Sequence, residues 1–201
     1  MTPEHLIAFN VALLFAIASP GPALLVATQT ALAHGRTAGI AVGIGLALMA
    51  SIWTLLALLG LDAVFALVPW AYGVVKIAGA IFLLWIAYST WRGARKPLQE
   101  RQPVPAARAF RTGFFINLLN PKSVLFSAAV LVVIFPQGLS LMENATIMAN
   151  HFALEVVCYS ALSCMLTTPA VARRYLAAKV WLDRAAALIL GALGLRLLLS
   201  R

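Results

Sequence analysis

Six apolar stretches, each long enough to cross a lipid bilayer as a helix, account for most of this chain. A bilayer core about 30 Å thick takes roughly 20 apolar residues as an α-helix. Only 10% of the residues are charged, against about 25% in soluble domains, so the chain cannot cover a water-facing surface. We therefore predict an all-α membrane protein with six transmembrane helices, at residues 5–33, 38–61, 69–91, 113–136, 146–168 and 181–199.

The connections between these stretches are short with one exception, so residues 1–201 are expected to form a single transmembrane domain. The exception is a proline-containing basic loop at 92–112, which separates two halves, about 1–91 and 106–201. The first stretch is not expected to be a cleaved signal peptide. Glu4 and His5 stand where such a leader needs basic residues, and the apolar run continues past Pro22.

The net charge of +9 is concentrated on alternate connections, a distribution that indicates membrane topology and no nucleic-acid partner. The other connections hold Glu4, Asp62 and Glu143 and almost no basic residue before the C-terminal arginines. By the positive-inside rule the basic connections are cytoplasmic, and both termini face outward. The basic residues on the predicted cytoplasmic side are Arg36, Arg92, Arg95, Lys96, Arg101, Arg108, Arg111, Arg173, Arg174, Lys179 and Arg184.

The two halves show a weak internal repeat. Residues 5–30 align with 106–131, which places Pro20 on Pro121. Halves of three helices each must have opposite orientations, so we predict a 3+3 inverted repeat. Proline-interrupted segments at equivalent positions of inverted halves indicate a transporter binding site. The alternative is a chance alignment of apolar stretches.

The first stretch is interrupted by Ser19, Pro20, Gly21 and Pro22. Each proline removes a backbone donor, and glycine allows dihedral angles that other residues resist, so we predict that helix one breaks here. Freed backbone groups at membrane depth are tolerated only against protein or a water-filled cavity. The half-helix that starts near Pro22 then suits a carboxylate at its N-terminus. The alternative is a simple proline kink.

The fourth stretch is interrupted at Asn117, Asn120, Pro121 and Lys122, so we predict a second broken helix. An ammonium at this depth costs at least a few kcal/mol and should face a partner or water. Our hypothesis is that Lys122 pairs with an anionic substrate group or with a protein carboxylate. Asn117 and Asn120 are suited to capping the freed backbone groups.

Glu155 is the carboxylate within the fifth stretch. A buried carboxyl group can exchange a proton near neutral pH, which a proton-coupled carrier needs. Glu155 is therefore our candidate for proton coupling, and a static ion pair with Lys122 is the alternative. We expect His151 to lie nearer the outer interface.

The second stretch carries small residues four apart: Gly35, Gly39, Gly43, Ala47 and Ser51. Such a strip permits close helix packing, within the chain or as a homodimer seam; packing within the chain is the interpretation that we adopt. The sequence holds no zinc-site spacing, phosphate-binding glycine loop or catalytic triad, so we predict no metal, no cofactor and no enzymatic activity.

These motifs resemble the LysE/RhtB family of amino-acid exporters, over essentially the whole chain. The chain departs from the family at Ile81, where a tyrosine is usual, and at Ser19, where a glycine is usual, and the family supports no role for Glu155. The motifs that carry the resemblance are Ser19-Pro20-Gly21-Pro22, Gly113-Phe114 with Asn117 and Asn120-Pro121-Lys122, and Lys76-Ile77-Ala78-Gly79-Ala80 with Tyr88.

The resemblance implies a multi-pass carrier of the bacterial inner membrane. It would move amino acids or related small zwitterionic metabolites outward, driven by the proton gradient. The predicted substrate site combines the two breaks. Two alternatives remain from the residues alone: an intramembrane enzyme using Ser19 and His151, which lacks a nucleophile-elbow context, and a channel, which lacks a filter motif or acidic ring.

Overall fold

The computed structural model describes residues 1–18, 21–60, 69–95, 104–136 and 138–199. Over these residues the chain forms eight α-helices and no strand, which confirms the all-α class. The helices are α1 (Pro3–Ala18), α2 (Pro22–His34), α3 (Arg36–Leu58), α5 (Pro69–Gly93), α6 (Ala106–Leu118), α7 (Pro121–Ile134), α8 (Leu141–Leu166) and α9 (Pro169–Leu199).

Two of the described helices, α3 and α8, are both long enough and apolar enough to cross a membrane. The pair α1 and α2 is bent by 62° and counts as a third span if the two helices cross together. These findings fit a multi-pass membrane protein. The count of six spans and the inverted repeat stay predictions.

Both predicted breaks coincide with interruptions between consecutive helices. α1 ends at Ala18 and α2 begins at Pro22, whereas α6 ends at Leu118 and α7 begins at Pro121. In each case a proline occupies the first turn of the new helix, where its missing N–H breaks no intrahelical bond. Ser19 and Pro20 lie outside the described residues.

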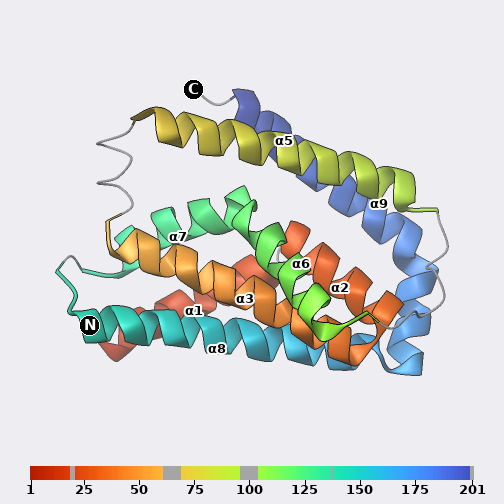
Figure 1. The fold of residues 1–201 in the computed structure, drawn as a ribbon, viewed down its shortest axis with the longest axis horizontal. Helices are drawn as coiled ribbons and strands as arrows, with labels where there is room; N and C mark the ends of the chain where they lie inside the picture. Colours follow the sequence, from red (N-terminus) through yellow and green to blue (C-terminus); the bar gives the residue numbers. More distant parts are fainter. Residues whose placement is uncertain (19–20, 61–68, 96–103, 137, 200–201) are drawn as a thin grey trace.

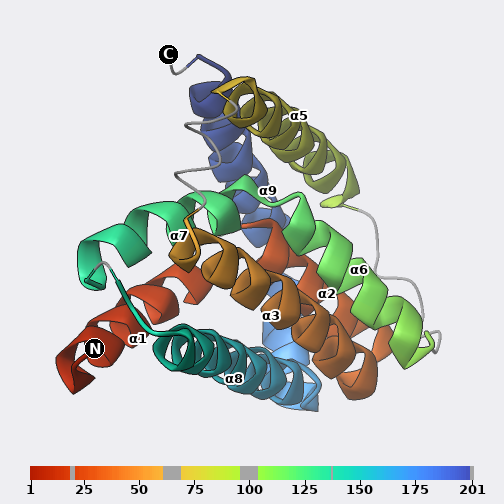
Figure 2. The ribbon, with the colours of Figure 1, turned by 60° about the vertical axis from the view of Figure 1, so that its left-hand side comes forward.

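Helix α3 is the centre of the arrangement (Figure 1). It packs against α6, α8 and α2, while α5 and α9 form a long antiparallel pair beside this group (Figures 1 and 2). The ends of helices that carry Arg36, Arg92, Arg108 and Arg173 lie on the right of Figure 1, and the N-terminus lies on the left. These arginine-bearing helix ends lie on one side, as expected if the basic connections alternate with the others. The orientation of this side in the membrane stays a prediction.

The small residues of α3 pack within the chain, as predicted. A Cβ atom on Gly43 would lie 2.5 Å from Tyr159 Cβ of α8, and one on Gly45 would overlap the backbone carbonyl of Phe110 in α6. A Cβ on Gly113 of α6 would in turn overlap the carbonyl of Val42 in α3. The backbones of α3 and α6 therefore touch at a pair of glycines, and this contact fixes α6, the helix that precedes the second break, against α3.

The glycine crossing gives the first testable prediction. Gly45→Ala forces the backbones of α3 and α6 apart, and overpacking of this kind costs about 1–3 kcal/mol. We expect the thermal unfolding temperature of the detergent-purified protein to fall by several degrees. Gly93→Ala is the control, because a Cβ there meets no atom within 4 Å. Equal unfolding temperatures for the two variants would contradict the described crossing.

Candidate functional site

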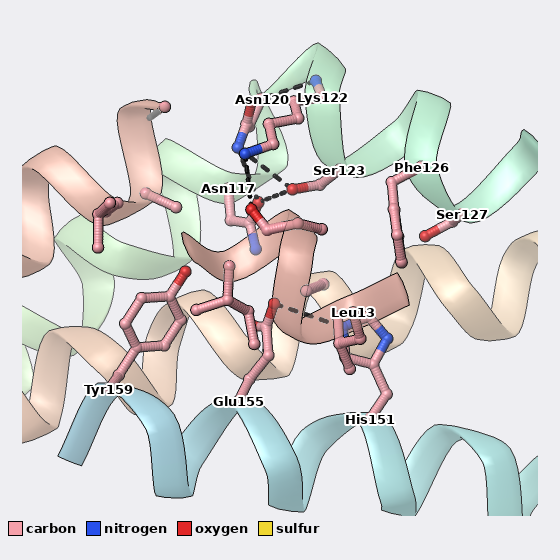
Figure 3. Close-up of a pocket in the computed structure, with 16 residues that line it drawn as sticks. Leu13, Asn117, Asn120, Lys122, Ser123, Phe126, Ser127, His151, Glu155 and Tyr159 are labelled. Carbon is pink, nitrogen blue, oxygen red and sulfur yellow. Dashed lines mark hydrogen bonds and ion pairs between the residues drawn. The ribbon is translucent and has the colours of Figure 1, made fainter. Parts of the chain in front are cut away.

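A cavity of about 40 Å³ lies where the two breaks meet (Figure 3). Residues of α1, α2, α3, α6, α7 and α8 line it, and they include every described residue of the predicted substrate site except Pro22 and Pro121. One water molecule needs roughly 10–15 Å³ of such space. The cavity therefore has room for a few waters or for the polar end of a small solute.

The first break leaves the carbonyl of Ala16 without its helical donor. That carbonyl would accept a hydrogen bond from the N–H four residues later, but the residue there is Pro20, which has none. The Lys122 ammonium donates to Ala16 O at 2.7 Å. A side chain of the second break thus satisfies a backbone group of the first.

At the second break, Pro121 removes the i+4 donor for the carbonyl of Asn117, which is aligned with Ala16 in the predicted repeat. This carbonyl accepts instead from the backbone N–H of Asn120 at 3.2 Å. The Trp53 indole N–H of α3 also donates to Asn117 O, at 3.3 Å. A side chain from another part of the fold therefore contacts each break.

Asn117 and Asn120 both stabilise the second break. Asn120 Oδ1 accepts from the backbone N–H of Lys122 at 3.2 Å and so caps α7. Asn117 Nδ2 donates to Leu46 O of α3 at 2.6 Å, and its Oδ1 accepts from Ser123 Oγ. Both asparagines line the cavity. Their amides hold the cavity wall in place through these contacts.

The N-terminus of α2 differs from that of α7. Its N-cap residue, Gly21, is extended and provides no side-chain cap. The amides of the first turn of a helix lack intrahelical acceptors. Gly21, Ala23 and Leu24 line the cavity, whereas Pro22 is buried as the first residue of α2. The positive end of the α2 dipole therefore meets the cavity without a capping side chain.

Two titratable side chains of α8 form the opposite wall. His151 and Glu155 are 2% and 6% exposed, and His151 Nε2 lies 3.4 Å from Glu155 Oε1. His151 Nδ1 is within 2.7 Å of Thr54 Oγ1 from α3. We expected His151 nearer the outer interface, and the structure places it in the cavity wall. The spacing of four residues between His151 and Glu155 indicates that both side chains share one helix face.

The acidic and basic groups of α9 belong to a separate cluster. Lys179, which was counted with the loop charges, is buried, and its ammonium lies 2.7 Å from Asp183 Oδ2 and 3.1 Å from Ala94 O. Burial, and then the nearby Asp183, raise the pKa of Tyr175 to about 12. This cluster ties α9 to the end of α5. In the described residues, no group of three or more His, Cys, Asp or Glu side chains could hold a metal ion.

Comparison with known proteins identifies relatives over nearly the whole chain. A family model described as LysE type translocator matches residues 14–201. The threonine efflux protein of Escherichia coli (strain K12) is 25% identical over 92% of this chain and 93% of its own length. YahN, an uncharacterized membrane protein of the same strain, is 30% identical over 98% of this chain and 91% of its own length.

A third relative matches over a shorter range. The homoserine/homoserine lactone efflux protein of Salmonella typhimurium is 34% identical over 59% of this chain and 57% of its own length. No solved structure matches the chain.

The contact of Trp53 with the second break gives a further prediction. Trp53→Phe keeps an aromatic side chain but removes the indole N–H that donates to Asn117 O. Loss of this hydrogen bond should lower the free energy of unfolding by about 1 kcal/mol. Thermal unfolding in detergent measures the loss. Trp181→Phe serves as control because Trp181 is 74% exposed. If both variants unfold at the wild-type temperature, the indole does not support the break.

Proposed function

Since the chain belongs to the LysE type translocator family, we propose that it exports a small neutral amino acid across the bacterial inner membrane by proton-coupled alternating access. The observation that carries this proposal is the single cavity shared by the two breaks. Binding sites in carriers of this general design lie between discontinuous helices of the two halves.

The charges around the cavity match a zwitterion. Figure 3 shows Lys122 and Glu155 entering the cavity from opposite sides. We assign the substrate carboxylate to the Lys122 ammonium and the amides at the start of α2. The substrate ammonium then faces Glu155. Ser19 and Pro20 remain proposed members of this site, together with Gly21, Pro22, Asn117, Asn120 and Pro121.

Hydroxyl groups in the wall support a hydroxylated substrate side chain. Ser123 and Ser127 of α7 line the cavity, and Ser127 Oγ lies 3.4 Å from Thr54 Oγ1. Two of the relatives are named for threonine efflux and for homoserine or homoserine lactone efflux. We therefore propose L-threonine or a similar hydroxy amino acid as substrate.

The bond between Lys122 and Ala16 offers a route from binding to conformational change. A substrate carboxylate competes with Ala16 O for the Lys122 ammonium. Substrate binding then weakens the contact between α1 and α7 that closes the first break. A ligand shifts a conformational equilibrium only through such differential contacts.

The substrate assignment is tested with Lys122 variants in proteoliposomes. Loss of a buried charged contact costs about 2 kcal/mol or more, so Lys122→Ala should weaken L-threonine binding by about 30-fold or more. Lys122→Gln keeps a donor for Ala16 O without the charge and should bind as poorly. The measurement is L-threonine counterflow together with thermal stabilisation by L-threonine.

Arg108→Ala, an exposed change on α6, is the control for this experiment. Unchanged counterflow and stabilisation in both Lys122 variants would show that the carboxylate binds elsewhere. In the wild-type protein the same assay separates the alternatives, since a channel shows no counterflow and an enzyme shows no flux.

The role of Glu155 in coupling is tested separately. Glu155→Gln retains an acceptor for the substrate ammonium, with weaker binding for want of the charge, but cannot release a proton. We expect counterflow at equal pH to persist at saturating L-threonine and accumulation driven by a pH gradient to disappear. Glu143→Gln is the matched control, because Glu143 pairs with the N-terminal ammonium at 2.6 Å and does not line the cavity. Full gradient-driven transport by Glu155→Gln would exclude this residue as the coupling group.

A further inference from the structure

The environment of His151 differs at its two ring nitrogens. Nδ1 contacts the Thr54 hydroxyl at 2.7 Å, and Nε2 faces Glu155 Oε1 at 3.4 Å. Over the part of the chain that the structure describes, His151 Nε2 and Glu155 Oε2 are buried atoms without a hydrogen-bond partner. Buried polar atoms in this condition call for an explanation, such as a role in proton transfer or an unseen ligand.

The surroundings of the pair restrict where a proton can go. α1 contributes the apolar side chains of Phe9 and Leu13, and the Phe9 ring centroid lies 5.6 Å from that of His151. α3 contributes the Thr54 hydroxyl. The titratable groups that face the pair are Lys122 from α7, with Tyr159 and Cys158 from α8 itself.

We propose that His151 and Glu155 hold the transported proton as a pair, and that the substrate ammonium competes with this proton at the Glu155 carboxylate. This inference rests on the proposed export function and extends it. It replaces a single coupling carboxyl with a two-residue proton site.

The proposal gives the pair two states. In both, we assign the Nδ1–H as donor to the Thr54 oxygen at 2.7 Å, which keeps one proton on that nitrogen. Without a further proton, Nε2 is unprotonated, Glu155 is a carboxylate, and the pair carries one negative charge that attracts an ammonium. When water on the outer side delivers a proton to Nε2, Nε2–H donates to Oε1 and the pair becomes neutral. The substrate ammonium then leaves, and the proton is released to water on the opposite side.

This competition explains how the carrier exchanges a proton for a zwitterion. Proton and substrate ammonium neutralise the same negative charge, so the His151–Glu155 pair is neutralised in either occupied form in the low-dielectric interior. His151 is thereby assigned a role in coupling, while Thr54 acts as a positioning residue that orients the imidazole with Nε2 toward Glu155.

The test uses His151→Gln in proteoliposomes with radiolabelled L-threonine as probe. Counterflow at equal pH requires no net proton movement and should stay within about twofold of wild type, whereas accumulation driven by a pH gradient should fall about tenfold, a size typical of a coupling between two ligands. Ser163→Ala is the control, because Ser163 lies buried on the same face of α8 and bonds only locally, to Tyr159 O at 2.7 Å. Ser163→Ala should retain both activities.

The outcomes separate this inference from the proposed function. Full gradient-driven accumulation by His151→Gln overturns the paired site and leaves the exporter intact. Loss of both activities in His151→Gln, with the protein folded, also overturns it, because binding would then depend on the imidazole. Absence of L-threonine counterflow and of gradient-driven flux in the wild-type protein overturns the proposed function itself.

If His151→Gln does not fold, a second measurement tests the proposal in a protein whose cavity residues are unchanged. The chain has three histidines, so His5→Gln with His34→Gln leaves His151 as the only imidazole in a protein labelled with ¹⁵N-histidine. Addition of L-threonine at fixed pH should move the Nε2 resonance toward that of the unprotonated nitrogen. An Nε2 resonance that L-threonine leaves unchanged, in a sample shown to bind it, would overturn the proposal.

Discussion

Two missing backbone N–H groups, at Pro20 and Pro121, impose the constraint on which the rest of the structure depends. Each leaves a carbonyl without its helical donor, and an unsatisfied backbone group in a lipid environment costs several kcal/mol. The Lys122 ammonium donates to Ala16 O, whereas Asn117 O accepts from the backbone N–H of Asn120 and from the Trp53 indole. The breaks are therefore tied to each other and to α3, and the cavity forms where they meet.

The two breaks share a cause but differ in what they leave open. Asn120 caps α7, whereas Gly21 leaves the start of α2 without a side-chain cap. The second break supplies the Lys122 ammonium and a wall held by Asn117 and Asn120, and at the first break the start of α2 faces the cavity. Opposite them, α8 presents His151 and Glu155. In the function that we propose, these two sides meet the carboxylate and the ammonium of an amino acid.

Local chemistry made part of this arrangement predictable from the sequence. Apolar length indicated the helices, the prolines indicated both interruptions, and the cost of charge in lipid singled out Lys122 and Glu155. The partner of Lys122 was not predictable, because a backbone carbonyl carries no sequence signal. His151 and the buried Lys179–Asp183 pair were missed for a related reason: the rotation of a helix about its axis depends on tertiary packing. The six-span count, the inverted repeat and the orientation of the termini stay predictions.

The central claim is that substrate binds at the N-terminus of α2, inside the cavity shared by the breaks. The most direct test replaces Cys158 and Cys164 with serine, introduces Ala23→Cys, and measures the rate of labelling by a small water-soluble thiol reagent with and without L-threonine. The account predicts that L-threonine slows labelling at position 23 and leaves labelling of Arg108→Cys, an exposed position in the predicted basic connection, unchanged. Equal labelling of Ala23→Cys with and without bound L-threonine would contradict it.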